Sequence, residues 1–378
     1  MEKRKLEKLG IETSLLGFGC MRFPVTAEGK INEPEAEKML DKAISAGVNY
    51  FDTAYPYHGG ESELFVGKAM KKYDRSSFFL ATKLPLWMVN SLEDAKRVFQ
   101  EQLNKLQTDY REFYLLHGLG KNRFDDMVKL GVVDWMEELK AQGKIRYMGF
   151  SFHDRYESFE YIINYRDWDF CQIQLNYMDA EEQAGLRGYQ LAEKKGVPLV
   201  IMEPVKGGSL AAFAGDITDR FRSLDPEASI ASFALRWVGS LPGVKVILSG
   251  MSSMEQVEDN LKTFEEFRPL SEKETQGIND IVALIRSRVK NGCTGCRYCM
   301  PCPAGVDIPG NFRVWNTYHM YQNYNVVKRN WEMDMGESKQ AKCCVKCGKC
   351  EAACPQKLSI RQDLELVQAD LDKREFVI

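Results

Sequence analysis

The sequence predicts an α/β protein in which a parallel sheet closes into a (β/α)8 barrel, the TIM-barrel architecture, followed by a smaller, mainly α-helical domain. Short β-rich runs alternate with longer amphipathic segments eight times, which is typical of a parallel sheet with crossover helices. Nine of the eleven cysteines lie between Cys293 and Cys354, and this abrupt change of composition indicates a domain boundary. We therefore expect a barrel over residues 1–270, a connecting helix over 271–290 and a second domain over 291–378.

The composition and charge of the chain argue against some classes of protein. The 378 residues are 44% apolar and 28% charged, with a net charge of −3, which suits a globular chain and gives no electrostatic sign of nucleic-acid binding. The charged start, MEKRKLEKLGIETS, has no apolar stretch behind it, and the longest apolar runs are too short to cross a bilayer. We expect a cytoplasmic protein without membrane insertion, and in the cytoplasm clustered thiols bind metal more often than they form disulfides.

Each predicted element follows from a local pattern. Asn32 before Pro34 suits a helix start, and Gly47 and Gly196 suit helix ends. The expected strands span residues 15–19, 48–52, 78–82, 112–117, 145–151, 170–175, 197–202 and 244–249. The expected helices span residues 35–46, 61–72, 91–106, 124–142, 156–164, 181–195, 229–238 and 253–263.

An open, doubly wound sheet is the alternative architecture. Such a sheet usually carries a glycine fingerprint after its first strand, and GFGCMR offers G-x-G without the third glycine. The dinucleotide-fingerprint interpretation is therefore weak, and the closed barrel is favoured.

Polar and ionisable residues follow the predicted strands, where a barrel of this kind places its chemistry. Asp52, Tyr57, Lys83 and His117 form a chemically complementary set. An ammonium lowers the pKa of a neighbouring phenol, a carboxylate holds the ammonium charged, and a neutral imidazole orients a carbonyl oxygen. Together they would protonate an oxygen while hydride reaches its carbon. Taken singly, each residue is more often structural than catalytic, but four complementary types at successive strand ends favour a site.

Several motifs resemble the aldo-keto reductase family. They are GFGCMR, NYFDTAYPYHGGESE, FLATKLP, FYLLHGL, IRYMGFS, QIQLNYMD and ILSGM, and the match runs over roughly residues 5–268. The resemblance implies a (β/α)8 barrel that reduces carbonyls with a nicotinamide cofactor, usually NADPH. It assigns the family's catalytic tetrad to Asp52, Tyr57, Lys83 and His117. Tyr57 is preferred because the family's tyrosine lies five residues after the aspartate, and Tyr55 is the fallback.

The resemblance also implies a cofactor-binding set. Ser151, Gln174 and Asn176 would hold the nicotinamide amide. The remaining positions, from the strand-one loop to the adenine end, are Gly19, Met21, Arg22, the segment from Glu203 through Gly207 to Gly208, Leu210, Ser249, Gly250, Met251, Gln256 and Asn260.

The sequence departs from the family near the eighth strand. The family often grips the 2′-phosphate of NADPH there with Lys or Arg, whereas Gly250, Met251 and Gln256 stand at these places. Lys206 is another source of positive charge. The choice between NADPH, NADH and a flavin stays open.

The cysteine-rich segment contains two nearly identical runs. Cys344, Cys347, Cys350 and Cys354 form C-x2-C-x2-C-x3-C before Pro355, the bacterial run for [4Fe-4S] clusters. Cys293, Cys296, Cys299 and Cys302 repeat it with a last gap shorter by one residue.

In paired runs of this type the fourth cysteine serves the other cluster. We therefore assign Cys293, Cys296, Cys299 and Cys354 to one cluster and Cys344, Cys347, Cys350 and Cys302 to the second, which leaves Cys343 over. Two structural zinc sites are the main alternative, but zinc requires no third cysteine two residues on and no repeated C-P ending. Disulfides are the least favoured interpretation.

The 41 residues between the two runs are too long for a minimal two-hairpin ferredoxin. Residues 310–323 and 326–333 have helical, aromatic patterns, and the whole chain resembles the group of aldo-keto reductases that carry a C-terminal, all-α ferredoxin-like 4Fe-4S domain. Trp315, Tyr318, Tyr321 and Tyr324 are interpreted as core or docking residues. His319 is not needed as a ligand because eight cysteines suffice.

Two functions remain in view. In the first, an oxidoreductase acts on a small-molecule carbonyl or alcohol, and two 4Fe-4S clusters exchange electrons with a redox cofactor in the barrel and with a protein donor or acceptor. Because a carbonyl takes two electrons as hydride and each cluster passes one, linking them requires a two-electron cofactor that can also transfer electrons singly. A flavin would do this, whereas NAD(P)H alone does it poorly. In the second, NAD(P)H alone serves the barrel, and the iron–sulfur domain is a structural, docking or oxygen-sensing module.

Overall fold

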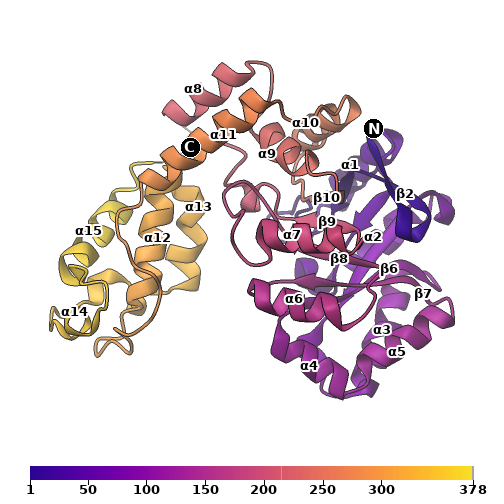
Figure 1. The fold of residues 1–378 in the computed structure, drawn as a ribbon, viewed down its shortest axis with the longest axis horizontal. Coiled ribbons are helices and arrows are strands. Elements are labelled where there is room, and N and C mark those ends of the chain that lie inside the picture. The colour runs from indigo at the N-terminus through magenta and orange to yellow at the C-terminus, as the bar shows by residue number, and fades with distance from the viewer. Residues whose placement is uncertain (214, 377–378) are drawn as a thin grey trace. The chain divides into compact units, whose positions relative to one another are not determined.

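The computed structural model describes residues 1–213 and 215–376. The described chain divides into two compact units (Figure 1). Unit 1 comprises Met1–Gly207 and Ala231–Leu270, and unit 2 comprises Gly208–Ile230 and Ser271–Ile378. The segment 208–230, which the sequence prediction placed in the barrel, thus groups with unit 2, because its helix α8 (Gly215–Leu224) packs on helix α11 (Glu272–Ser287).

Unit 1 is a closed barrel of eight parallel strands among the described residues, in the order β10-β3-β4-β5-β6-β7-β8-β9. In chain order these strands are β3 (Leu16–Gly19), β4 (Tyr50–Asp52), β5 (Phe79–Leu84), β6 (Arg111–Leu119), β7 (Ile145–Phe152), β8 (Phe170–Gln174), β9 (Leu199–Met202) and β10 (Val244–Ser249). Each overlaps a strand expected from the sequence, and the predicted fold class is confirmed. The open-sheet alternative is wrong, because β10 pairs with β3 and closes the ring.

Helices surround the strands of unit 1 (Figure 1). Each expected helix has a counterpart among the described residues, and the one expected over residues 124–142 forms two helices rather than one. Gly131 has a φ of 72°, a left-handed conformation that interrupts the helix between Lys129 and Val132. The helices of the barrel are α1 (Glu33–Ser45), α2 (Ser62–Met70), α3 (Leu92–Leu106), α4 (Lys121–Lys129), α5 (Val132–Ala141), α6 (Tyr156–Tyr165), α7 (Gly185–Lys194), α9 (Ile230–Gly239) and α10 (Met254–Glu265).

An antiparallel hairpin that the sequence did not predict precedes the barrel. It consists of β1 (Lys3–Leu6) and β2 (Ile11–Ser14), joined by a turn in which Gly10 has a φ of 66°. Leu6 is fully buried among inward-facing strand residues such as Tyr50, Phe113 and Val246. The hairpin therefore fills the amino-terminal end of the barrel, opposite the end where the strands finish.

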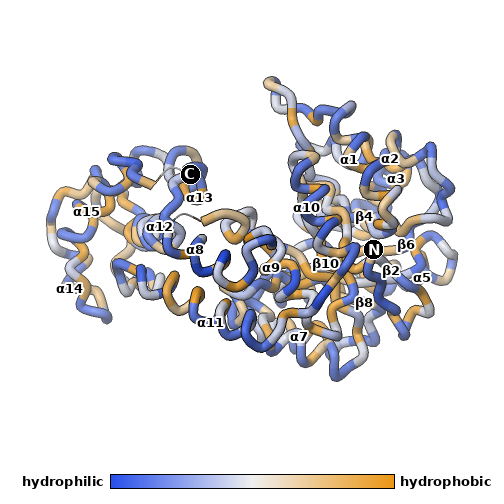
Figure 2. The backbone as a smooth tube through the Cα atoms, turned by 90° about the horizontal axis from the view of Figure 1, so that it is seen from above, coloured by the Kyte–Doolittle hydropathy of each residue, from blue (hydrophilic) through white to orange (hydrophobic). Residues whose placement is uncertain are grey.

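The barrel core follows from the alternation of side chains along each strand. Residues on one side of the strands fill the interior, and those on the other side pack under the helices. Figure 2 shows the same pattern along the chain, with hydrophobic segments through the strands and hydrophilic segments on the outer turns. This packing fixes the carboxyl ends of the strands and so positions the residues that follow them.

Unit 2 is helical. Helix α11 begins at a capping box, in which Ser271 and Glu274 satisfy each other's backbone N–H groups. The other helices are α8, α12 (Ile308–Tyr321), α13 (Tyr324–Arg329), α14 (Lys349–Ala353) and α15 (Ile360–Lys373), and a π-helical turn, Asn330–Asp334, follows α13. Helices α12 and α15 pack together around Phe312, Leu364 and Val367. None of the helices in the described residues has the length and apolar character needed to cross a membrane.

Candidate active site and metal centres

Asp52 and Lys83 form a buried ion pair at the carboxyl ends of β4 and β5. The Lys83 Nζ atom lies 2.6 Å from Asp52 Oδ1 and also donates to the Thr53 carbonyl at 2.8 Å. The two side chains are 3% and 1% exposed. Burial acts to lower the pKa of Lys83, but Asp52 and Tyr57 outweigh it and raise the pKa, so the ammonium stays charged. Burial raises the pKa of Asp52 against the opposing pull of Lys83.

Tyr57 reaches this pair from the loop after β4. It begins the short turn Tyr57–Gly60, in which His58 and Gly59 adopt left-handed φ angles of 52° and 65°. Lys83 Nζ donates to the Tyr57 hydroxyl at 3.5 Å and lies 5.1 Å from the ring centroid. Burial raises the pKa of Tyr57 although Lys83 opposes the shift. The phenol is therefore protonated at neutral pH, and its pKa is raised rather than lowered as the sequence suggested.

Tyr55, the fallback tyrosine, points elsewhere. Its hydroxyl donates to Glu101 on α3 at 3.1 Å, and the Lys105 ammonium lies 3.8 Å from its ring centroid. The Lys83 ammonium contacts Tyr57, whereas Tyr55 is engaged by Glu101 and Lys105. The geometry favours Tyr57 as the phenol of the tetrad.

His117, on β6, completes the group. Its ring lies 6.3 Å from the Tyr57 ring and 5.2 Å from the Trp87 ring, measured between centroids. Burial, followed by the charge of Lys83, lowers the pKa of His117 to about 3, so the imidazole is neutral at physiological pH. Its Nδ1 atom is buried and has no hydrogen-bond partner in the described part of the chain. A neutral ring with an unused polar atom can bond to a small polar ligand.

Gln174 and Asn176, at the end of β8, share a carboxylate that the sequence analysis did not single out. Asp179 Oδ2 accepts hydrogen bonds from Gln174 at 2.9 Å and from Asn176 at 3.1 Å. Lys206 Nζ lies 2.5 Å from the same oxygen. Lys206 is therefore already neutralised and is a poor candidate for gripping a phosphate. The only signal for Asp179 in the sequence is its place after a strand, in NYMD.

The loops after β3 and β10 approach each other closely. A Cβ on Gly19 would meet the Ser249 carbonyl oxygen at 3.2 Å, and one on Gly250 would meet Arg22 Cγ at 2.8 Å. The stem of the exposed Arg22 thus lies over Gly250. Asn260 donates to the Ser249 hydroxyl at 2.8 Å. A side chain at either position would force its neighbour to shift, so glycine suits this approach.

The remaining residues of the predicted cofactor set differ in hydrogen bonding, exposure and backbone conformation. The Ser151 hydroxyl accepts the Gly118 N–H at 2.8 Å, and Gln256 Oε1 accepts the Ser252 N–H at 2.8 Å. Met21 is exposed, Met251 is buried, Glu203 and Gly207 have positive φ angles, and Gly208 and Leu210 belong to unit 2.

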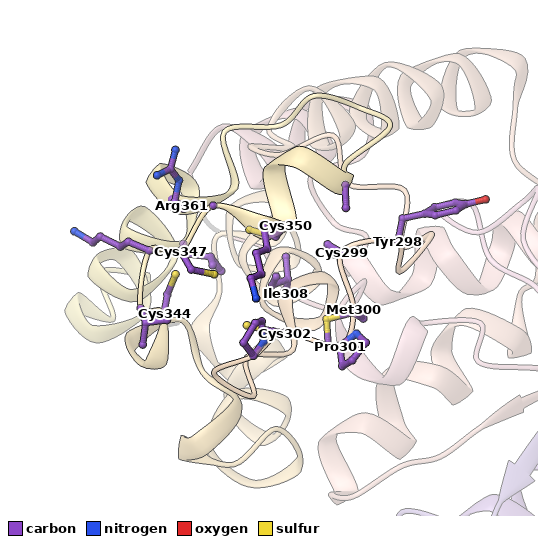
Figure 3. A pocket seen from close by; sticks show the side chains of 17 residues that line it. Tyr298, Cys299, Met300, Pro301, Cys302, Ile308, Cys344, Cys347, Cys350 and Arg361 are labelled. Carbon is purple, nitrogen blue, oxygen red and sulfur yellow. The ribbon is translucent and has the colours of Figure 1, made fainter.

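Eight thiols surround two cavities in unit 2. A cavity of about 300 Å³ is lined by Cys302, Cys344, Cys347 and Cys350, and also by Cys299 (Figure 3). A narrower cavity of about 20 Å³ is lined by Cys293, Cys296, Cys299 and Cys354. The fourth cysteine of each run thus lines the cavity of the other run. This grouping agrees with the crossed pairing expected from the sequence.

The thiols suit iron–sulfur clusters by their chemistry, because thiolate is the usual ligand of such clusters. All eleven cysteines are free thiols in the structure. Among the described residues, no three His, Cys, Asp or Glu side chains are arranged to hold a single metal ion. Cys343 lines neither cavity, and its Sγ donates to the Glu337 carbonyl at 3.4 Å.

The aromatic residues between the runs lie in the helical core. Trp315, Tyr318, Tyr321 and Tyr324 are all nearly buried. His319 Nε2 lies 2.8 Å from Asp370, which also accepts from Trp315 Nε1 at 2.8 Å. Asp370 engages the Nε2 atom of His319, and His319 lines neither thiol cavity.

Comparisons with known proteins agree with both units. A model of the Aldo/keto reductase family matches residues 15–283, and a model of a 4Fe-4S dicluster domain matches residues 292–358. L-galactose dehydrogenase of Arabidopsis thaliana is 26% identical over 315 residues, which cover 77% of this chain and 96% of that protein. The oxidoreductase YqkF of Bacillus subtilis is 26% identical over 312 residues, 74% of this chain and 95% of that protein.

Solved structures give the same result. The holo form of aldo-keto reductase AKR11C1 from Bacillus halodurans superposes with a TM-score of 0.61 at 29% identity, covering 74% of this chain and 96% of its own. The chain therefore belongs to the aldo/keto reductase family of oxidoreductases and carries a C-terminal 4Fe-4S dicluster domain.

Proposed function

We propose that the protein interconverts a small-molecule carbonyl and its alcohol in the barrel, and that two [4Fe-4S] clusters in unit 2 exchange the electrons of this reaction with a protein partner. The barrel supplies the proton chemistry, and the thiol-lined cavities supply one-electron transfer. The ligand sets are the crossed ones, Cys293, Cys296, Cys299 and Cys354 for one cluster and Cys344, Cys347, Cys350 and Cys302 for the other.

In the reducing direction, Tyr57 donates its phenolic proton to the carbonyl oxygen while a hydride reaches the carbonyl carbon. One C–H and one O–H bond form, the C=O π bond breaks, and the carbon is reduced by two electrons. Lys83, held by Asp52 at 2.6 Å, stabilises the phenolate that remains. His117, neutral because burial lowers its pKa, donates a hydrogen bond that orients the carbonyl oxygen.

A nicotinamide or flavin bound in the barrel would supply or accept the hydride. The residues suit a nicotinamide in kind: two side-chain amides at β8, a serine at β7 and glycines where the β3 and β10 loops meet. The amides of Gln174 and Asn176 now bond to Asp179 and would exchange that partner for the cofactor. With Lys206 paired to Asp179, Arg22 is the exposed cation beside Gly250.

The observation that carries the redox proposal is the division of the eight thiols between two cavities. Each cavity is lined by three cysteines of one run and the last cysteine of the other run, the four thiols that a [4Fe-4S] cluster requires, and Cys299 lines both cavities. A zinc site or a docking module does not require the two runs to exchange their last cysteines.

The decisive experiment is an anaerobic EPR titration of the purified holoprotein, preceded by analysis of iron, sulfide, zinc, nicotinamide and flavin. We expect two clusters per chain that become paramagnetic when an alcohol substrate with its cofactor, or NAD(P)H, is added. Zinc in place of iron, or clusters that stay silent during turnover, would overturn the redox linkage in favour of a structural or sensing module. Tightly bound flavin would identify the two-electron carrier.

A further inference from the structure

The loop that holds the second cysteine run is strongly basic. In KCCVKCGKC, residues 342–350, Lys342, Lys346 and Lys349 each adjoin a cysteine, and the stretch contains no acidic residue. Residues 342–361 as a whole contain five basic residues and one acidic residue. In a chain with a net charge of −3, this is a local reversal of sign.

These side chains are accessible. Lys342, Lys346 and Lys349 are exposed, and Val345 between them is 67% exposed. Val345, Lys346 and Lys349 line the rim of the 300 Å³ cavity, and Cys347 is itself exposed there. Figure 3 shows Cys344, Cys347 and Arg361 on the same side of this cavity. We call Lys342, Val345, Lys346 and Lys349 the lysine surface.

The charges of the lysine surface are only partly neutralised within the chain. Lys342 pairs with Glu337 at 3.1 Å, and Lys346 pairs with Glu365. Lys349 has no ion-pair partner among the residues that the structure describes. The loop of the first cysteine run is different, because Arg297 is its single charged residue and pairs with Asp307 at 3.5 Å. The unpaired basic charge is therefore concentrated at the 300 Å³ cavity.

We propose that the lysine surface is the docking site for an acidic one-electron carrier protein, and that the cluster at the 300 Å³ cavity is the entry and exit point for electrons. This inference rests on the proposed function and names its partner and port. Complementary charge steers such a carrier to the site, an exposed valine contacts it, and an exposed ligand cysteine shortens the electron path. One electron leaves the reduced carrier and reduces the cluster, with no bond made or broken.

The alternative role for these lysines is to stabilise the thiolates and set the reduction potential of the cluster. The two roles differ in what they predict. Loss of docking slows transfer from an acidic carrier and leaves the potential and small uncharged reductants unaffected. Loss of a local stabilising charge shifts the potential and affects every reductant alike.

The test uses the anaerobic, iron-loaded full-length chain in a stopped-flow spectrometer. Cluster bleaching is followed after mixing with a reduced flavodoxin of strongly negative net charge, and separately with a zwitterionic viologen of no net charge. Lys349→Glu is the main variant, because the side chain lacks an ion-pair partner and a glutamate is favourable at the first residue of helix α14. Lys328→Glu is the matched control, since Lys328 is exposed on α13, on the far side of α12 from α14 and α15 (Figure 1).

We expect Lys349→Glu to lower the flavodoxin rate constant by about tenfold at low salt, with the difference shrinking as salt screens the charges. The viologen rate and the reduction potential should change little, and Lys328→Glu should behave as wild type. Equal slowing with both reductants, an unchanged flavodoxin rate, or equal effects of both variants would overturn the docking site. A wild-type cluster that no reductant bleaches would instead refute the proposed redox function.

Discussion

Replacing Lys83 with methionine tests the buried pair on which the barrel chemistry depends. The change removes the ammonium that bonds to Asp52 at 2.6 Å and to the Thr53 carbonyl at 2.8 Å, in surroundings where both side chains of the pair are at most 3% exposed. Removing one partner of a buried ion pair costs about 3–5 kcal/mol, because the other charge is left without compensation. We expect a loss of this size in the free energy of unfolding of the barrel at pH 8.

The pKa of Asp52 determines how the destabilisation caused by Lys83→Met changes with pH. Burial already raises the pKa of Asp52, and without the opposing ammonium the pKa rises further. A carboxyl whose pKa is higher in the folded state contributes stability below the unfolded value of about 3.9, and that contribution disappears as pH rises through the folded pKa. The destabilisation of Lys83→Met should therefore be small near pH 4 and grow toward neutral pH.

Urea unfolding from pH 4 to 8 measures this effect. Tryptophan fluorescence follows the chain, and visible absorbance of the clusters follows unit 2 separately. The double variant Asp52→Asn with Lys83→Met leaves no unpaired charge from this ion pair, so it should regain much of the lost stability and lose the added pH dependence. A Lys83→Met loss below about 1 kcal/mol at pH 8, or one that does not vary with pH, would show that the pair is solvated and our account mistaken.

Three further predictions concern individual side chains. Tyr57→Phe should fold normally and lower the single-turnover rate of carbonyl reduction by about 10²–10⁴-fold; a wild-type rate would remove the acid role of this phenol. His117 should titrate near pH 3 by ¹³C NMR of labelled histidine, and because its folded pKa of about 3 lies below the unfolded value, its contribution to stability should be present above about pH 6.5 and decline in acid, a trend that His117→Asn should flatten. A titration midpoint at the ordinary histidine value would contradict the burial argument. Cys302→Ser should lose iron and change the EPR spectrum, whereas Cys343→Ser should keep the iron content and the EPR spectrum of the wild type. The reverse result would exchange the assignments of these two cysteines.

Much of the fold was predictable because strand and helix periodicity acts locally. The eight barrel strands stand out as β-rich runs, and the pairing of β10 with β3 follows from closing eight parallel strands. The amino-terminal hairpin was missed because its strands are short and mostly polar, with few apolar residues such as Leu6 and Ile11 to pack on the barrel. The grouping of 208–230 with unit 2 depends on the contact between Leu224 and Gly277, which lie far apart in sequence.

The residues of the candidate site could be predicted from the sequence, but their pKa shifts and ion-pair partners could not. Strand ends bring Asp52, Lys83 and His117 to one rim, so sequence position alone selects them. The pKa of Tyr57 depends on burial, which the sequence does not reveal, and burial outweighs the ammonium. Asp179 was missed for a similar reason, since its importance comes from accepting hydrogen bonds from three side chains, one of which is Lys206.

The exchange of cysteines between the two cavities affects how the clusters of unit 2 would assemble and how they would be lost. Cys302 and Cys354 each lie with the opposite run, so loading one centre draws both loops into place for the next. Assembly should then be cooperative, and preparations should hold chains with a full complement of iron or none, with few half-filled ones. Oxidative damage to either cluster would then release both, so the two clusters should be lost together.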